Sequence, residues 1–477
     1  MYLMRIFFFS DRCLWEMFCT ICHKVNFKLC IPADEIHDLE NTIQESYNMI
    51  LDVLMSIDVE KADAANQMDK IIIFDAIKKD TGFNELNNVV RNHLRHWYIE
   101  KGCEMADRLI STGGLQAKTA EFGKFLVNLG ISLKNFDKKK EAMKYFNDAL
   151  ETEIIDENRV LLYISIGEVY VYNGEGNNAS SVLDKAIAIC DCKAWPSEKA
   201  RALNIYAMLH NNAGPSWAPM AIECGKKAYE LQKTNENFSD MSTTYNNLGN
   251  AYIAKRKYTI GIQFYKTGLD IALSYFGHMH PLTAKIYNNL GNVYTTIDSY
   301  EEAHTYLEKA LHIRVAINGK HHSCTIRSYQ LCGHLCVKRH KYADALEYFF
   351  KALESSVITM GRDNFETGII YLSIAEIFEQ QEDKFMSAIN YYGLALKIFN
   401  SCVGTEYIKI QRKTSAALRE LQLSQRDITA SESESVLLSC HSLEEQQLTQ
   451  SKTPQQEVST LRESKRLKSI SSHKTSN

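Results

Sequence analysis

The sequence has little proline and little glycine. Of the 477 residues, 6 are proline and 22 are glycine, whereas average proteins contain about 5% and about 7% of these residues. The scarcity of glycine excludes collagen-like sequence, and the scarcity of both residues favours helix over sheet. Disorder of the whole chain is disfavoured, because aromatic residues make up 10% of it and can bury a large apolar area.

The sequence also lacks a charge excess and a long hydrophobic run. Its 54 basic and 58 acidic residues give a formal charge of −4, which is too balanced for the positive field that non-specific nucleic-acid binding needs. The strongest apolar run near the start, residues 6–9, ends at Ser10, far short of the ~20 residues that span a bilayer. We therefore expect no nucleic-acid partner, no membrane span and no secretory signal.

The 13 cysteines are odd in number and thinly spread, which favours reduced thiols in a cytoplasmic protein. Cys19, Cys22 and His23 match the C-x-x-C-H spacing of c-type haem attachment. A zinc site could instead use Cys19, Cys22 and Cys30 with either His23 or His37. Both matches are short and irregular. We favour a poorly ordered leader over residues 1–33, with no metal or cofactor.

An internal repeat dominates the rest of the chain. The segment YNNLGNAY at 245–252 recurs as YNNLGNVY at 287–294, an offset of 42 residues, and the same offset leads on to Gly333 and Ala375. Small residues mark the positions where helix backbones are expected to approach closely. These repeat-packing residues are Gly130, Gly167, Gly249, Gly291, Gly333, Ala303, Ala345 and Ala388.

Each repeat unit has the apolar spacing of two helices separated by a turn. In residues 245–269 the large apolar side chains recur at i, i+3, i+4 and i+7 on both sides of the turn. Gly277, Gly319 and Gly361 each follow one of the repeat-packing glycines by 28 residues. Each is predicted to end a helix in the left-handed conformation. One unit has an extended loop at 214–219, and the last has one extra residue at 380–384.

These residues resemble the tetratricopeptide repeat. The resemblance covers residues 115–404, about seven repeats, and the 42-residue spacing with the phrase GHMHPLTA at 277–284 is similar to the kinesin-light-chain and nephrocystin type. It implies an all-α fold, a right-handed α-solenoid of stacked helical hairpins. Kinesin light chains carry a long coiled coil before the repeats, whereas here only residues 36–57 suggest heptads.

The regions outside the repeats are predicted from composition and periodicity. Residues 34–114 form a helical N-terminal cap region, and residues 405–423 form an amphipathic capping helix. Residues 424–477 are rich in serine and threonine and contain no aromatic residue, so a disordered tail is expected.

A solenoid of this kind is expected to bind its partner on a concave surface lined by the first helix of each hairpin. Asn246 and Asn250 lie one turn apart on such a helix, away from its apolar face. The resemblance implies that these and equivalent positions line a peptide groove. The predicted groove residues are Asn246, Asn250, Lys285, Asn288, Asn292, Arg327, Gln330, His334 and Lys338.

The chemistry of this set suits an extended peptide from another protein, because an Asn amide can pair with both backbone groups and the cations favour acidic side chains. The leading hypothesis is a non-enzymatic cytoplasmic scaffold or adaptor, of cytoskeletal or cargo type. A co-chaperone that binds C-terminal carboxylate tails is the alternative, although its clamp needs a lysine where Asn246 or Asn288 stands. The oligomeric state is not predicted.

Catalysis is not expected. Histidines 278, 280, 321 and 322 fall in recurring turns, and Cys332 and Cys336 occupy core positions that hold Leu and Tyr in other repeats. A buried cysteine usually behaves as a small hydrophobe. No phosphate-binding loop, zinc-protease helix or nucleophile elbow is found in the sequence.

Overall fold

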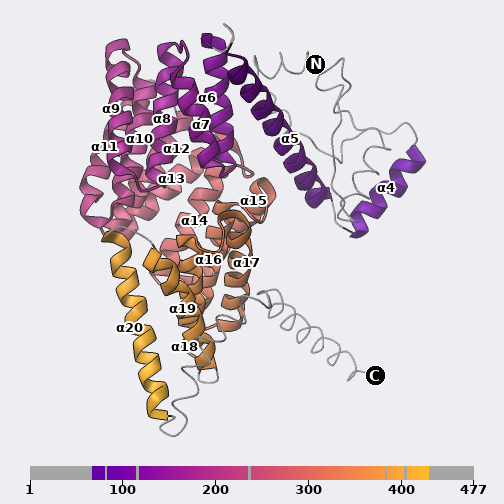
Figure 1. Cartoon of the computed structure of the whole chain (residues 1–477), viewed down its shortest axis with the longest axis vertical. Coiled ribbons are helices and arrows are strands. Elements are labelled where there is room, and N and C mark those ends of the chain that lie inside the picture. Colours follow the sequence, from indigo (N-terminus) through magenta and orange to yellow (C-terminus); the bar gives the residue numbers. More distant parts are fainter. Residues whose placement is uncertain are drawn as a thin grey trace. The chain divides into compact units, whose positions relative to one another are not determined.

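The computed structural model describes residues 67–80, 83–113, 118–234, 238–381, 384–401 and 405–428, and within them every regular element is helical (Figure 1). The predicted leader, the heptad segment, the tail beyond residue 428 and the Cys19, Cys22 and His23 motif lie outside these residues. The all-α prediction is confirmed.

The helices follow one another in pairs. Before the pairs come α4 (Gln67–Asp80) and α5 (Phe83–Thr112). Seven pairs then follow in the described residues, and in each pair we call the earlier helix the first helix and the later one the second helix. The pairs are α6 (Ala120–Asn135) and α7 (Lys139–Leu150), α8 (Asp156–Tyr172) and α9 (Gly176–Lys193), α10 (Pro196–Asn212) and α11 (Ala218–Thr234), α12 (Phe238–Ala254) and α13 (Tyr258–Phe276), α14 (Pro281–Thr296) and α15 (Tyr300–Asn318), α16 (Ser323–Lys338) and α17 (Tyr342–Met360), and α18 (Phe365–Glu379) and α19 (Phe385–Ser401).

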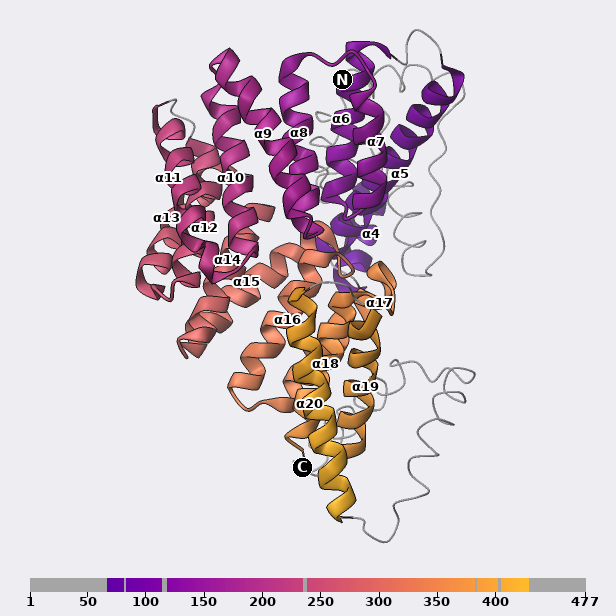
Figure 2. The same ribbon diagram turned by 60° about the vertical axis from the view of Figure 1, so that its left-hand side comes forward.

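The chain divides into two compact units. Unit 1 comprises residues 1–293 and 312–319, and unit 2 comprises residues 294–311 and 320–477. In unit 1, first helices α6, α8, α10 and α12 each pack against the helix that follows, as α16 and α18 do in unit 2 (Figure 2). The fold is a solenoid of stacked hairpins.

In several helical pairs, a glycine of the first helix faces a large aromatic ring of the second helix. We call this line of contact between two paired helices the seam. A Cβ added to Gly333 would lie 2.8 Å from Cε2 of Phe349, and one added to Gly249 would lie 2.5 Å from the ring of Tyr265. These are closer than real Cβ contacts, so only glycine fits without displacing the ring. Ala303, Ala345 and Ala388 are fully buried.

The helix α5 packs against the first hairpin. Its residues Tyr98 and Met105 belong to the same buried apolar cluster as Phe122 of α6. The carboxylate of Asp107 accepts hydrogen bonds from Lys144 Nζ at 2.7 Å and from the Tyr145 hydroxyl at 3.0 Å. A helix in this place keeps the apolar side of the first hairpin from water.

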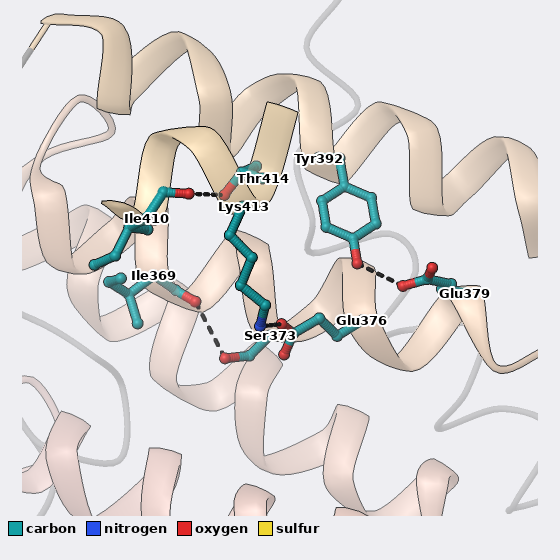
Figure 3. Close-up of polar contacts among 8 residues, drawn as sticks. All are labelled: Ile369, Ser373, Glu376, Glu379, Tyr392, Ile410, Lys413 and Thr414. Atoms are coloured by element: carbon teal, nitrogen blue, oxygen red, sulfur yellow. Dashed lines mark hydrogen bonds and ion pairs between the residues drawn. The ribbon is translucent and has the colours of Figure 1, made fainter. Parts of the chain in front are cut away.

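At the other end, α20 (Thr405–Ile428) packs against α19. Thr414 and Leu421 are buried, and Lys413 Nζ lies 2.9 Å from the Glu376 carboxylate of α18 (Figure 3). The helix ends at residue 428, five residues beyond the end predicted for the capping helix.

The glycines that end the second helices differ from the prediction in one respect. Gly277 and Gly361 have φ of 77° and 92°, as expected, but their ψ values are −175° and 165°. They therefore lie in the extended positive-φ region and not in the left-handed helical region. That region is essentially restricted to glycine, so a glycine is needed here more strictly than the sequence suggested.

Two glycines of unit 2 should respond oppositely to alanine. Gly361→Ala is expected to lower the free energy of unfolding by about 1–3 kcal/mol, because the new side chain cannot adopt this conformation without strain. Gly393→Ala lies inside α19, where an added Cβ has nothing within 4 Å, so a gain of about 0.5–1 kcal/mol is expected. Chemical denaturation of both variants tests this, and shifts of the same sign would contradict it.

Candidate peptide-binding surface

The first helices carry polar side chains at two recurring positions. We use the term seam residue for Gly167, Ala207, Gly249, Gly291, Gly333 and Ala375, the small residues that recur in successive first helices. One recurring polar position directly follows the seam residue and is occupied by Glu168, Asn250, Asn292, His334 and Glu376. The other precedes the seam by six residues and is occupied by Arg201, Lys285 and Arg327. We call the accessible side chains of unit 1 the unit 1 face, formed by Lys134, Glu168, Arg201, Asn250, Lys285 and Asn292. We call those of unit 2 the unit 2 face, formed by Arg327, His334, Lys338 and Glu376.

Three predicted groove residues are not accessible. Asn246 is fully buried, and Asn288 and Gln330 are each only 2% exposed. The prediction that they line an exposed groove was wrong. A stacked first helix meets its own second helix and the first helices of both neighbouring repeats, so its exposed strip is narrower than helical periodicity alone suggests. The other six predicted groove residues are half-buried or exposed.

The buried amides of unit 1 connect neighbouring first helices. Asn289 Nδ2 of α14 donates to Asn246 Oδ1 of α12 at 2.7 Å. Similarly, Asn247 Nδ2 donates to the backbone oxygen of Asn204 in α10 at 3.0 Å. Because buried polar groups need partners, these hydrogen bonds fix how one repeat sits on the next.

Asn250 belongs to the unit 1 face and is held in one orientation. Its Oδ1 accepts from the Tyr265 hydroxyl at 2.5 Å and from Asn289 Nδ2 at 3.3 Å. The carbonyl side of the amide is therefore occupied within the protein. What remains for a ligand is the Nδ2 donor, which suits a peptide carbonyl or a carboxylate.

Charge on the unit 1 face gathers around one carboxylate. Glu168 of α8 is ion-paired with Lys134 of α6, and Lys285 and Arg201 act on the same carboxylate electrostatically. Burial by itself would raise the pKa of Glu168, but the three cations outweigh it and hold the pKa below its ordinary value. The carboxylate is thus ionised and the cluster keeps an excess of positive charge.

Sequence reasoning missed Lys134, Glu168 and Arg201 as members of this surface. A signal for two of them exists, since Glu168 follows seam residue Gly167 and Arg201 stands two 42-residue periods before Lys285.

The unit 2 face combines a histidine with charged neighbours. Desolvation by the surrounding side chains and then the positive charge of Arg327 lower the pKa of His334, while Glu376 acts in the opposite direction, although part of the His334 side chain is exposed. Its ring stands 5.1 Å from that of Phe349 in an edge arrangement. Arg327 and Lys338 are exposed, and Glu376 is paired with Lys413 (Figure 3).

Two of the turn histidines, and the free cysteines Cys332 and Cys336, are engaged by the structure around them. His280 Nδ1 and His322 Nδ1 accept from backbone N–H groups two residues later, at 3.2 and 3.1 Å, so both cap the start of a first helix. Cys332 and Cys336 line a cavity of about 230 Å³ between α15, α16 and α17. Burial raises the pKa of both thiols, that of Cys332 to about 12, which leaves them poor nucleophiles.

Within the ranges that the structure describes, no three metal-binding side chains gather at one place. In the same ranges, no helix combines the length and apolar character needed to cross a membrane.

Comparison with known proteins agrees with the repeat pattern. The tetratricopeptide repeat family model matches residues 240–314 and 299–356. No curated protein sequence matches the chain.

Solved structures resemble the chain at low identity. BtubC (BKLC) from P. vanneervenii is 15% identical, with a TM-score of 0.41, and the match covers 50% of this chain and 94% of that one. A putative kinesin light chain with nearly identical TPR-like repeats from Podosopora anserina is 16% identical, with a TM-score of 0.32 and coverage of 42% and 95%. Aspartyl phosphate phosphatase F from Bacillus subtilis is 15% identical, with a TM-score of 0.44 and coverage of 79% and 97%.

The match to the family model agrees with the 42-residue period, with the glycines that face a large side chain of the next helix, and with the successive helical pairs. Residues 240–356 of the chain thus match tetratricopeptide repeats, and the helical pairs before and after them continue the same arrangement.

Proposed function

We propose that this protein is a non-enzymatic adaptor that binds an extended peptide segment of another protein along its first helices. The observation that carries the proposal is the contrast between buried small residues and accessible polar residues along those helices. In unit 1 the seam residues are buried while Asn250, Lys285 and Asn292 remain half-buried or exposed at repeating positions. In unit 2 considered by itself, the same contrast holds for Arg327, His334 and Lys338. Repeated polar groups at a spacing set by the stack suit the repeated backbone of an extended peptide.

The charges favour an acidic peptide. Lys285 and Arg327 occupy the same position of successive repeats, and a guanidinium can hold a carboxylate through two parallel hydrogen bonds. A cytoplasmic adaptor of cytoskeletal or cargo type is the use that the 42-residue repeat favours. The co-chaperone alternative is weaker, because the clamp position that needs a lysine holds Asn246 or Asn288 and both are buried.

A double variant of the unit 1 face tests the proposal. Lys285→Ala with Asn292→Ala is expected to weaken binding of a labelled hexaglutamate peptide by about tenfold or more, since it removes one charged and one neutral polar group. Fluorescence anisotropy measures the affinity, and thermal unfolding should be unchanged.

The matched control is Lys226→Ala with Asn177→Ala. Both residues are exposed on second helices of unit 1, so this pair removes the same groups away from the proposed surface. Equal losses in the two double variants, or a loss of thermal stability that accounts for the weaker binding, would count against the proposal.

A further inference from the structure

Three helical pairs carry the same stack of two aromatic rings. The first ring stands on the first helix, three residues after its seam residue, and the second ring stands twelve or thirteen residues further on, in the second helix. The ring centroids are 5.2, 5.6 and 5.6 Å apart, with interplanar angles of 11°, 9° and 28°. In chain order, the stacked pairs are Tyr252 with Phe264, Tyr294 with Tyr306, and Phe378 with Tyr391.

The pair formed by α16 and α17 keeps one side chain of this stack and replaces the other. Tyr348 stands at the second position, but the first position holds Cys336. One turn earlier on α16, Cys332 stands at the position that Leu248 and Leu290 hold in their own repeats. Both cysteines are smaller than their counterparts, and the cavity of about 230 Å³ lies where Cys332, Cys336 and Tyr348 face one another. The missing ring thus accounts for the cavity.

The cavity has the size and the walls of a site for one aromatic ring. A protein cavity of about 150 Å³ is large enough to bind benzene, so a cavity of about 230 Å³ has room for a ring with a short substituent. The Tyr348 ring offers a surface for stacking, and sulfur makes favourable contacts with rings. Lys351 Nζ lies 5.5 Å from the centroid of that ring and also lines the cavity, which adds a cation beside an incoming ring.

The cavity is reached from a different side of α16 than the unit 2 face. Glu308, Lys341 and Asp344 line it and are exposed, so its rim is polar and meets solvent. Cys336 and His334 are two residues apart on one helix and therefore point to nearly opposite sides of it. The cavity is a site separate from the surface proposed above for acidic peptides.

We propose that this cavity is a second binding site, which receives the ring of a tyrosine side chain from a partner protein. The incoming ring takes the place that Tyr252 and Tyr294 fill in their own repeats and stacks on Tyr348. An amino-acid side chain is the natural occupant, because side chains fill the equivalent space in the three other pairs. Tyrosine suits the cavity because a single ring matches its volume and the hydroxyl can bond to the charged rim.

Saturation-transfer NMR with two uncharged peptides tests the site on the full chain. The peptides are acetyl-GSYSG-amide and acetyl-GSLSG-amide, which differ only at the central side chain. The tyrosine peptide should bind with a dissociation constant on the order of 1 mM, the affinity expected for a side chain of about eight heavy atoms. The leucine peptide should bind about fivefold more weakly, because it cannot stack on Tyr348.

Filling the cavity from within should remove the site. Cys336→Tyr restores the ring that other repeats carry, so it should weaken binding of the tyrosine peptide at least about tenfold and raise the midpoint of thermal unfolding by about 2–4 °C. The matched control is Cys324→Tyr, since Cys324 is an exposed cysteine of the same helix and does not line the cavity. The control should change the affinity by less than about twofold.

A second variant serves if circular dichroism shows that Cys336→Tyr does not fold. Cys332→Leu puts back the side chain that Leu248 and Leu290 provide in other repeats, and it reduces the same cavity. It should weaken binding of the tyrosine peptide at least about threefold, because less room is left for the ring.

The free side-chain analogue p-cresol separates the two sources of a ring. Binding of p-cresol without binding of the tyrosine peptide would assign the cavity to a free aromatic molecule and overturn the proposal. Equal binding of the two peptides, no binding of either, or a tyrosine-peptide affinity that filling the cavity leaves unchanged would also overturn it. A preference for tyrosine that is lost in Cys336→Tyr and kept in Cys324→Tyr supports the site.

Discussion

Phe349→Ala is expected to lower the free energy of unfolding of unit 2 by about 3–5 kcal/mol, the range for removing a large buried aromatic side chain. Phe349 is fully buried and its ring fills the space left by the missing side chain of Gly333. Without the ring, α16 and α17 face each other across a cavity. Urea denaturation followed by circular dichroism measures the loss.

The same helix offers a matched control. Ile358 lies on α17 but is 62% exposed, so Ile358→Ala should change stability by less than about 0.5 kcal/mol. Comparable losses in the two variants would show that the response comes from α17 as a whole and not from the seam.

Substitution of Gly333 tests whether this glycine and the ring of Phe349 share one contact. Gly333→Ala should cost about 1–3 kcal/mol in the original protein because the new Cβ meets the ring. In a Phe349→Leu background the cost should be smaller by at least about 0.5 kcal/mol, since leucine lacks the ring edge that the Cβ would strike. Additive losses would mean that the two residues do not share one contact.

The contacts between paired helices were predictable from the sequence, because the residues that form them lie close together in the chain and recur in each repeat. A glycine followed sixteen residues later by a large side chain, as in Gly333 and Phe349, recurs with the period of the chain. Only a helical hairpin brings these two residues into contact at every repeat. The helix pairs follow from equally local signals.

The binding surface was less predictable because its membership depends on contacts between repeats. Asn246 and Asn250 are one helical turn apart, yet one amide is buried against α14 while the other remains half-buried. Helical periodicity cannot separate them, since it does not say how closely the next first helix approaches. Glu168 and Lys285 are 117 residues apart in sequence, and their electrostatic contact arises only once the stack has formed.

Burial of these polar groups implies a second large effect, at the centre of unit 1. Asn204 Nδ2 donates to Thr244 Oγ1 at 2.9 Å, and the Thr244 hydroxyl donates to Gln232 Oε1 at 2.6 Å. All three side chains are at most 3% exposed, so water cannot replace a lost partner. The hydroxyl of Thr244 thus links three successive helices, α10, α11 and α12.

Thr244→Val keeps the shape of the side chain and removes that hydroxyl. It should lower the free energy of unfolding of unit 1 by about 2–5 kcal/mol, because an amide donor and an amide acceptor are left buried without partners. Urea denaturation measures the change, with Thr267→Val as the control. Thr267 is exposed on α13 and bonds only to its own helix, so its loss should stay below about 0.5 kcal/mol.

Replacing all three polar side chains should behave differently from replacing one. Asn204→Leu and Gln232→Leu, added to Thr244→Val, remove the unpaired groups along with the hydrogen bonds, and exchanging buried partners together for apolar groups can be nearly neutral. Most of the stability lost in Thr244→Val should therefore return. If the triple variant is instead less stable than Thr244→Val, the three residues stabilise the stack through packing. The stability lost in Thr244→Val would then not measure the penalty for unpaired buried groups.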